Sequence, residues 1–428
     1  MDKYLAKYAE PEADLSMPAG EQYANVLCIP AFDESPTFLE QMFSGNDEKN
    51  LLVILVINAS ADSSPSAIER TRDIGAYLTS RATAQKQLSE TTDWLSMDHS
   101  ADILLINRCS PGHFLPVKCG VGLARKIACD TACRLISEGI VTTQWIHSSD
   151  ADARLPPDYF QVMHQLDSTE DSAGIYPFMH LDHSASTVRL AQQLYDFSME
   201  YYVAGLRFAG SPWAFHTIGS TLVIHAGKYA QVRGFPKREA GEDFYLLNKL
   251  VKLGRTVSLK SEPVLLDSRL SDRVPFGTGP GVRTILALKN PVKEFMYYHP
   301  DCFLYLKTWQ AILADLGPDL VKDPDQLMDL INTRARVSGL NPELLQECLR
   351  TLGIHKAVIH AVRHGRETPV FRRHLQAWFD AFMTLKFIHW LRDNHFPSQP
   401  LSTIRDVADP DFAAFLEAYA PMPPAWNQ

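Results

Sequence analysis

Short, nearly continuous apolar runs alternate with polar turns along the first part of the chain. Val26–Ala31, Leu51–Ile57 and Ile103–Ile106 are such runs, and Trp145–His147 is a shorter one. Runs of this length predict strands that are buried on both faces. Val121–Ser137 has the spacing of a helix and lies between the third and fourth runs. Strands that alternate with helices in this way predict an α/β domain with a mostly parallel sheet flanked by helices.

A helical period replaces this pattern later in the chain. Thr187–Phe208 carries large apolar side chains at alternating spacings of four and three, which predicts an amphipathic helix with a buried aromatic stripe. Asn341 and Gly353 are typical of a helix start and a helix stop, and Phe371–Leu385 repeats the spacing of four and three. We therefore expect the last third of the chain to be helical.

These patterns divide the chain into three predicted parts. Residues 1–20 are expected to be a flexible lead-in, residues 21–296 the α/β domain, and residues 297–428 an α-helical C-terminal region. The helical region could pack on the α/β domain, form a homo-oligomer face, or make peripheral contact with a membrane surface. Its aromatic content permits membrane contact, whereas its mixed charge does not favour it.

Composition narrows the class of protein. The chain has 428 residues, 46% hydrophobic and 21% charged, which is typical of a globular protein. Its 41 basic and 50 acidic residues give a net charge of −9. This acidic balance argues against a nucleic-acid partner, because such proteins gain much of their affinity from basic contacts to phosphate.

The cysteines and the N-terminus bear on the compartment. Seven cysteines are scattered without a Cys-x-x-Cys pair, which favours reduced and mostly buried thiols over a disulfide framework or a zinc site. The first 20 residues contain several acids and no long apolar core, unlike a secretory signal. The apolar run Leu51–Ile57 is too short to cross a bilayer. We expect a cytoplasmic protein without a transmembrane segment.

A pair of aspartates follows the fourth predicted strand. Trp145–His147 leads into Asp150-Ala151-Asp152, and a Pro-Pro turn comes next. Side chains one residue apart on an extended backbone point the same way. Carboxylate oxygens suit a hard divalent cation such as Mg²⁺ or Mn²⁺, which could hold a diphosphate. A solvated turn is the simpler explanation of this motif taken alone, so its neighbours must decide.

Other polar segments occur in a definite order around the aspartate pair. They are Val26–Ser35, Asn58–Ser64, Gly120–Ala132 and Gly219–Leu247. In this order the chain resembles the family 2 glycosyltransferases over roughly residues 24–275. Ile29-Pro30-Ala31-Phe32 with Glu34 matches the opening motif of that family, with Asp33 where Asn is usual.

The remaining motifs match in the same residue-by-residue way. Gly120, Gly122 and Ala124-Arg125 match the family's helix start, with Lys126 where Asn is common. Asp150 and Asp152 match the metal motif. Gly241-Glu242-Asp243, preceded by Gly234-Phe235-Pro236, matches the acceptor-side motif.

The resemblance implies a GT-A (Rossmann-like) fold and transfer of a sugar from a UDP- or GDP-sugar to a hydroxyl acceptor. It places a divalent Mn²⁺ or Mg²⁺ ion on Asp150 and Asp152. Donor contacts are expected from Pro30, Ala31, Asp33, Glu34, Asn58, Asp62, Gly120, Arg125, Asp150 and Arg273. Asn58 and Asp62 are alternative contacts for the nucleobase, so uracil and guanine both stay open.

The chemistry of sugar transfer fits these residue types. Negative charge grows on the leaving diphosphate, and a bound divalent ion would neutralise it. The incoming hydroxyl needs a base, for which we choose Asp243, with Glu242 orienting the acceptor or capping the helix. A helix N-terminus tends to keep both carboxylates ionised. The alternative is that both only satisfy the helix end.

Further residues have two interpretations each. Arg125 could contact phosphate or fix the strand end that carries the aspartate pair. His225 or His299 could complete the metal site, although a lone histidine is more often structural. The glycine-rich segment Asp272–Gly281 could be a lid that brings Arg273 to the diphosphate, or a plain surface loop.

Three hypotheses follow. The leading one is a metal-dependent transferase that inverts the anomeric centre. The second is a retaining GT-A enzyme acting on a small acceptor, which needs no carboxylate base. The third is a nucleotide-sugar-binding protein without turnover.

Overall fold

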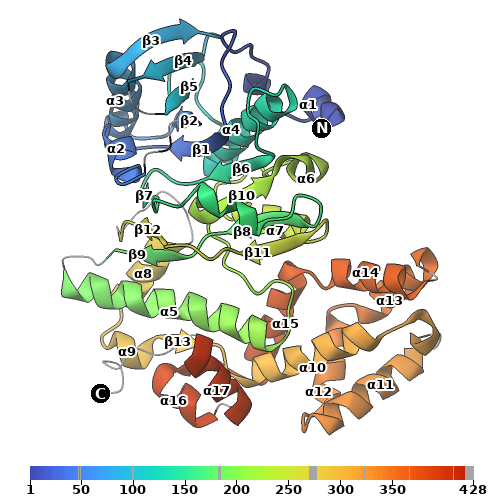
Figure 1. Cartoon of the computed structure of the whole chain (residues 1–428). Coiled ribbons are helices and arrows are strands. Elements are labelled where there is room, and N and C mark those ends of the chain that lie inside the picture. Colours follow the sequence, from blue (N-terminus) through green and yellow to red (C-terminus); the bar gives the residue numbers. More distant parts are fainter. Residues whose placement is uncertain are drawn as a thin grey trace. The chain divides into compact units, whose positions relative to one another are not determined.

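The computed structural model describes residues 1–46, 48, 50–98, 101–181, 185–268, 277–321, 324–365, 367–407 and 409–419. The chain forms two compact units, shown in Figure 1. Unit 1 comprises Met1–His183 and Thr217–Pro280, and unit 2 comprises Ser184–His216 and Gly281–Gln428.

A nine-stranded sheet forms the centre of unit 1, in the order β11-β8-β10-β6-β1-β2-β5-β4-β3. In this sheet β10 and β4 run in the direction opposite to the other seven strands, so most of its strands point the same way. Its strands are β1 (Asn25–Ala31), β2 (Leu51–Asn58), β3 (Ala82–Gln87), β4 (Thr92–Met97), β5 (Asp102–Arg108), β6 (Trp145–Ser148), β8 (Asp171–Ile175), β10 (Leu222–His225) and β11 (Arg255–Ser258).

Helices cover both faces of the central strands. Figure 1 shows α3 (Pro65–Arg81) and α4 (Gly120–Ser137) on opposite sides of β1 and β2. On one face of β2, Leu55 and Ile57 belong to the same hydrophobic core as Ile74 of α3. This two-sided burial explains why the strands appear in the sequence as continuous apolar runs. The predicted α/β class with a mostly parallel sheet is confirmed.

The remaining elements of unit 1 are short. A second sheet has the order β7-β12-β9, formed by β7 (Ala153–Arg154), β12 (Val264–Leu266) and β9 (Phe178–His180). The other helices are α1 (Asp2–Lys7), α2 (Phe38–Met42), α6 (Ala226–Gln231) and α7 (Glu242–Leu250). Helix α8 (Thr278–Leu286) begins at the end of unit 1 and continues into unit 2.

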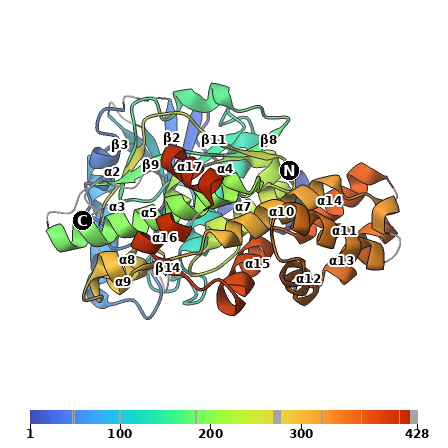
Figure 2. The same cartoon turned by 90° about the horizontal axis from the view of Figure 1, so that it is seen from below.

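Unit 2 is helical apart from one small strand pair, β13 (Met296–Tyr297) with β14 (Gln399–Pro400). Figures 1 and 2 show its helices from two directions. They are α5 (Ser186–Phe208), α9 (Pro291–Glu294), α10 (Asp301–Asp315), α11 (Pro324–Val337), α12 (Pro342–Thr351), α13 (Ile354–His364), α14 (Thr368–Trp378), α15 (Ala381–Asn394), α16 (Leu401–Val407) and α17 (Pro410–Tyr419).

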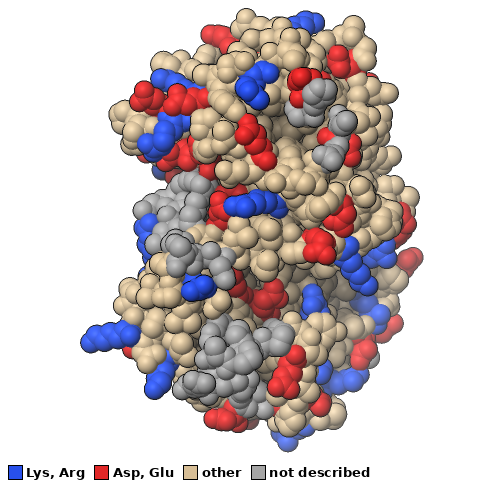
Figure 3. All heavy atoms as spheres, turned by 60° about the vertical axis from the view of Figure 1, so that its left-hand side comes forward, with Lys and Arg blue, Asp and Glu red and all other residues tan. Residues whose placement is uncertain are grey.

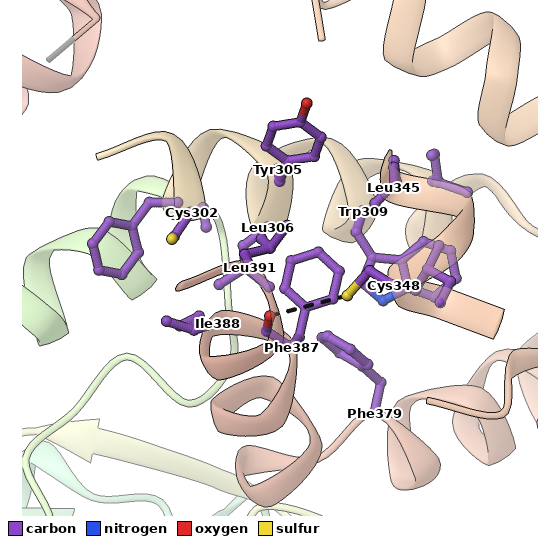
Figure 4. Packing of buried hydrophobic residues seen from close by; sticks show 14 of the residues in the cluster. Cys302, Tyr305, Leu306, Trp309, Leu345, Cys348, Phe379, Phe387, Ile388 and Leu391 are labelled. Carbon is purple, nitrogen blue, oxygen red and sulfur yellow. Dashed lines mark hydrogen bonds between the residues drawn. The ribbon is translucent and has the colours of Figure 1, made fainter. Parts of the chain in front are cut away.

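An aromatic core holds these helices together. Figure 4 shows Trp309 of α10, Cys348 of α12 and Phe387 of α15 pointing toward one another. The Cys348 thiol donates a long hydrogen bond to the carbonyl oxygen of Phe387, at 4.0 Å. The 4-3 spacing seen from Phe371 to Leu385 spans two helices, because Asp380 starts α15 by accepting a hydrogen bond from the Met383 N–H.

The compact units divide the chain differently from the predicted parts. Helix α5 falls inside the predicted α/β domain, yet Phe197 and Tyr201 of its aromatic stripe pack in the core of unit 2. Residues 1–20, expected to be a flexible lead-in, include α1, and Tyr4 and Leu5 of that helix are buried. A local pattern cannot show which core a helix joins, because the partner residues lie far away in sequence.

The surface and the thiols complete the description. All seven cysteines are free, and six of them are buried, as expected from their scattered positions. Acidic and basic side chains are interspersed among the described residues on the face that Figure 3 shows. Among the helices of the described residues, none combines the length and the apolar character that crossing a membrane requires.

Candidate active site

The aspartate pair lies where β6 ends beside β1. The two strands run in parallel, and Cys28 pairs with Ser148, after which the Ser149 N–H donates to the Cys28 carbonyl oxygen at 3.1 Å. Asp150 and Asp152 follow in a turn. A hydrogen bond from the Ala153 N–H to the Asp150 carbonyl oxygen closes this turn, also at 3.1 Å. The expected extended backbone is therefore absent at this pair, and the two carboxylates take different surroundings.

Pro30 is informative because β1 is an interior strand. Proline has no N–H to donate, so it fits a sheet only where no partner strand needs that bond. Along a strand, the backbone N–H and C=O groups of successive residues point alternately to the two neighbouring strands. The backbone nitrogen of Pro30 therefore points to the same neighbour as that of Cys28, which is β6. Strand β6 has already ended at Ser148 there. The proline thus marks the point where the sheet opens beside the aspartate pair.

A pocket of about 160 Å³ opens at this edge of the sheet. It is lined by Asp33, Glu34, Ser35, Phe38, Gln41, Ala151, Asp152, Ala153, Arg154 and Asp267. Four of these residues are acidic and one is basic, which gives the pocket a negative balance. Ligand pockets commonly measure roughly 300–1,000 Å³, so this one has room for only part of a typical ligand.

Asp33 has an unusual backbone conformation that its residue type allows. Its φ is +57°, in the left-handed region, which Asn and Asp tolerate better than most residues. Its N–H donates to the Thr71 hydroxyl at 2.9 Å, and its carboxylate pairs with Arg70 at 2.5 Å. The left-handed conformation suits the aspartate at position 33, where the chain turns sharply after β1.

The two alternatives for the nucleobase contact differ in exposure. Asn58 is buried, and its amide donates to the carbonyl oxygens of Ala31 and Val56 at 3.1 and 3.2 Å, which ties the ends of β1 and β2 together. Asp62 is exposed, and its carboxylate accepts from the Ser60 hydroxyl at 2.5 Å. Asn58 thus has a structural task, whereas Asp62 faces solvent.

Arg125 connects the aspartate pair with Glu242 at the start of α7. Its side chain is only 2% exposed, and its Nη2 lies 2.7 Å from Asp150 Oδ1 while its Nε lies 3.1 Å from Glu242 Oε1. Its Nη1 donates to the Ser148 hydroxyl at 2.9 Å and to the Gly219 carbonyl oxygen at 3.1 Å. We call this arrangement the Arg125 node.

The Arg125 node explains why position 219 is a glycine and where the guanidinium nitrogens find their hydrogen-bond acceptors. A Cβ atom at Gly219 would lie 2.5 Å from Arg125 Nη2, so only glycine leaves room for the guanidinium. All three nitrogens of the guanidinium have protein acceptors. This is the geometry of the second interpretation of Arg125, in which it fixes the strand end that carries Asp150.

The Glu242-Asp243 pair begins α7, after Gly241 in the left-handed conformation at φ +72°. Glu242 is buried against Arg125, and the Asp243 carboxylate accepts a hydrogen bond from the Phe244 N–H at 2.7 Å. Burial, followed by the neighbouring charge of Glu242, raises the pKa of Asp243 to about 7. Burial also raises the pKa of Glu242, against the pull of Arg125.

These pKa directions correct one expectation. The helix N-terminus was expected to keep both carboxylates ionised, but the loss of water around them outweighs the helix end. A carboxyl that titrates near neutral pH is better suited to exchange a proton than one that is always ionised.

Other expected residues lie elsewhere. His225 pairs with Trp145 at the start of β6, the opposite end of that strand from Asp150, and its Nδ1 caps α6 by accepting from the Lys228 N–H at 3.3 Å. His299 belongs to unit 2, where its ring packs against Phe396. Arg273 and half of the predicted lid, residues 272–276, lie outside the described residues. Gly120 begins α4, with φ +38°.

The residues present fit a divalent cation only in part. Among the residues that the structure describes, no group of three His, Cys, Asp or Glu side chains is arranged to hold a metal ion. Asp150 and Asp152 supply hard oxygen ligands, and a Mg²⁺-like ion commonly completes its shell with water and substrate phosphates. The oxygen ligands of the pair are of the kind that suits an ion bound together with a diphosphate.

The link from Arg125 to Glu242 is what sequence reasoning missed. Arg125 and Glu242 are 117 positions apart, and nothing local links them. The available signal was the Gly-x-Gly before Arg125, because Gly122 packs directly on backbone: a Cβ there would lie 2.6 Å from the carbonyl oxygens of Pro236 and Arg238. Such close approach is a common reason for glycine.

Comparison with known proteins gives little help. The chain matches no protein-family model, and it matches no curated protein. Among solved structures, the mannosyltransferase PcManGT from Pyrobaculum calidifontis, in complex with GDP-Man and Mn²⁺, is 17% identical, with 90% of this chain and 92% of that chain covered. The TM-score is 0.35, which is too low to bear on function, so the function has to be argued from the site.

Proposed function

We propose that this chain is a metal-dependent glycosyltransferase of GT-A fold that moves a sugar from a nucleoside-diphosphate sugar to a hydroxyl acceptor. The observation that carries the proposal is the Arg125 node. One buried guanidinium holds Asp150, from the donor-side motif, and Glu242, from the acceptor-side motif. A transferase of this kind needs both reaction partners beside one another, and the node joins the two motifs that would hold them.

The donor side is the edge of the sheet beyond β1 and β6. Asp152 lines the pocket there with Asp33 and Glu34, and Asp150 stands next to it in the turn. A divalent Mn²⁺ or Mg²⁺ ion on Asp150 and Asp152 would supply positive charge to the leaving diphosphate. Arg125 keeps Asp150 in place, because one carboxylate oxygen is hydrogen-bonded to a side chain that has no room to move.

The acceptor side is the start of α7. The acceptor hydroxyl oxygen forms a bond to the anomeric carbon as the bond from that carbon to the diphosphate oxygen breaks. Asp243 takes the hydroxyl proton, and the bonding electrons leave with the diphosphate. The raised pKa of Asp243 lets it take this proton and release it again near neutral pH.

This assignment favours inversion over retention. A direct displacement needs a base on the acceptor, and the Glu242-Asp243 pair offers a carboxylate with a pKa of about 7. The retaining alternative would leave the raised pKa of that half-buried carboxylate without a catalytic use. The non-catalytic alternative leaves the same feature unexplained.

The test is turnover of UDP- and GDP-sugars with Mn²⁺ or Mg²⁺ over a broad panel of hydroxyl acceptors, watching both transfer and hydrolysis. Asp243→Asn should abolish transfer while donor binding persists, and Asp73→Asn, at an exposed position on α3, should behave like the unmodified chain. Transfer that survives in Asp243→Asn would reject the base assignment. Donor binding without transfer or hydrolysis on any acceptor would favour the binding protein.

A further inference from the structure

The first residues of the chain are anchored on α4 by a buried polar cluster. The Tyr4 hydroxyl donates to Asp130 Oδ1 at 2.5 Å and accepts from Lys126 Nζ at 2.7 Å. The Glu10 N–H donates to Asp130 Oδ2 at 2.8 Å. Asp130 and Lys126 are both buried, so each needs these partners to offset the water that it has lost. Residues 1–10 are therefore a fixed part of unit 1, and we call them the N-terminal clasp.

The same ten residues contact the loop that leads into α7. The Tyr8 ring lies 4.5 Å from the Arg233 guanidinium carbon, in a cation–π contact. The Glu10 carboxylate pairs with Lys237 Nζ through both oxygens, at 2.7 and 2.9 Å. A Cβ at Gly234 would lie 2.5 Å from the Tyr4 hydroxyl, so the backbone of the loop rests on the clasp there.

The loop, residues 233–241, is also pressed against the start of α4. The Gly122 N–H donates to the Arg238 carbonyl oxygen at 3.0 Å, and a Cβ at Gly120 would lie 2.9 Å from the Glu239 Cα. Phe235 is buried, with its ring centre 5.8 Å from the Arg125 guanidinium carbon. The loop then ends at Gly241, directly before Glu242 and Asp243.

We propose that the N-terminal clasp positions the Glu242-Asp243 pair by holding the loop 233–241 against α4. Tyr8 and Glu10 are the positioning residues, because they reach the loop at Arg233 and Lys237 through their side chains. The effect on catalysis rests on the proposed function, whereas the effect on the loop does not.

The geometry explains why such a clasp would matter. Arg233 and Gly234 both have positive φ, at 65° and 66°, and Gly241 has φ of 72°, so the loop turns sharply at each end. Arg233 is costly to hold in that region because it is not a glycine, so the loop needs outside contacts to keep this conformation. Helix α4 supplies them on one side through Gly120 and Gly122, and the clasp supplies them through Tyr8 and Glu10.

The first test is hydrogen–deuterium exchange on the full chain, read over a peptide that spans residues 233–250. Tyr8→Ala and Glu10→Gln should each speed exchange there on the order of tenfold, while β1 and β2 stay protected. Tyr8→Phe should restore the slow exchange, because phenylalanine keeps the ring over Arg233. Tyr77→Ala and Glu90→Gln are the matched controls in unit 1, and neither should change this peptide.

The second test separates positioning from plain loss of structure. With donor and acceptor saturating, Tyr8→Ala should lower kcat on the order of 10- to 100-fold with little change in the KM for the donor, and Tyr8→Phe should recover it. A fall that Tyr8→Phe does not recover would contradict the proposal.

The two readouts fail independently. Unchanged exchange in both clasp variants, or a rise spread evenly over unit 1, would overturn the clasp whatever the enzyme does. Faster exchange limited to residues 233–250 supports the clasp even if the unmodified chain transfers no sugar. The absence of sugar transfer would reject only the proposed function.

Discussion

At the scale of single residues, the site depends on the buried ion pair of Arg125 with Glu242, to which the partly exposed Asp150 is joined. Arg125 neutralises Asp150 and Glu242 at once, and Asp243 lies beside them with a raised pKa. Buried charges are costly unless they are paired, so each group is sensitive to the loss of another. This coupling makes the residues of the node testable through both stability and pH dependence.

Replacing Arg125 should be strongly destabilising. In Arg125→Met, Glu242 and Asp150 lose their shared partner, and an unpaired buried charge typically costs about 3–5 kcal/mol of unfolding free energy. Arg70→Met is the control, because Arg70 is 53% exposed in its pair with Asp33 and such surface pairs contribute little to the free energy of unfolding. Urea denaturation measures both. Equal losses in the two variants would contradict the buried node.

The titration of Asp243 should make the rate of sugar transfer depend on pH near neutrality. A base must be ionised to accept a proton, so log kcat/KM should rise with pH below about 7 and level off above it. The measurement is the pH–rate profile of sugar transfer at low donor concentration. A profile that is flat from pH 5 to pH 9 would show that the group does not act as the base.

The raised pKa of Asp243 should also make the free energy of unfolding depend on pH, in the direction opposite to the rate. The folded pKa of about 7 lies above the ordinary value of 3.8, so the folded chain holds this proton more tightly than the unfolded chain. The unfolding free energy should therefore fall as pH rises from about 4 to about 7. Asp243→Asn should flatten that part of the curve, measured by denaturation at a series of pH values.

At the scale of elements, α4 is the organising part of unit 1. Its start contacts the loop 233–241 through Gly120 and Gly122, and its next turns carry Arg125, Lys126 and Asp130. Arg125 forms the node, while Lys126 and Asp130 bind the Tyr4 hydroxyl of the N-terminal clasp. Adjacent residues of one helix thus serve two separate groups of contacts.

Gly122→Ala tests the close approach of α4 and the loop. Alanine normally stabilises a helix by about 0.5–1 kcal/mol relative to glycine. Here the added Cβ would lie 2.6 Å from two backbone carbonyl oxygens, so we expect a loss of about 1–3 kcal/mol instead. Gly317→Ala is the control, since its Cβ would meet only the Thr368 side chain at 3.6 Å. A stabilising Gly122→Ala in thermal unfolding would contradict the packing.

The elements also show what the sequence could and could not tell. Strands β1, β2 and β5 and helices α4 and α5 follow the ranges expected from apolar spacing, because that spacing reflects local burial, and α12 lies between the start predicted at Asn341 and the stop predicted at Gly353. The turn at Asp150 and Asp152 was expected to be extended, since no local signal distinguishes the end of a strand from the turn beyond it. The Arg125 node and the clasp join residues more than 100 positions apart, which spacing cannot show.

At the scale of the whole molecule, the chain leaves unit 1 and returns to it. Helix α5 lies between β9 and β10 in sequence, yet it packs with α10 and α17 in unit 2. Phe197, Tyr201 and Phe208 of α5 contribute to the same core as Phe303 and Phe412. The helical C-terminal region is therefore incomplete without a segment from the middle of the chain.

A fragment of residues 297–428, the C-terminal region expected from sequence, should not fold alone. Without α5 its core loses several large aromatic side chains, each of which typically costs about 3–5 kcal/mol when removed. Circular dichroism should show low helicity, and adding a peptide of residues 184–216 should raise it. A cooperatively folded fragment without the peptide would show that α5 is dispensable.

The most direct test of the central claim is calorimetric titration of the full chain with UDP and with GDP, each with Mn²⁺, with Mg²⁺ and with a chelator. Asp152→Asn is the test variant, and Asp73→Asn is the matched control. We predict that one nucleotide binds, that the chelator abolishes binding, and that Asp152→Asn loses it while Asp73→Asn keeps it. If neither nucleotide binds under any condition, or if Asp152→Asn binds as tightly as the unmodified chain, the proposed donor site is wrong.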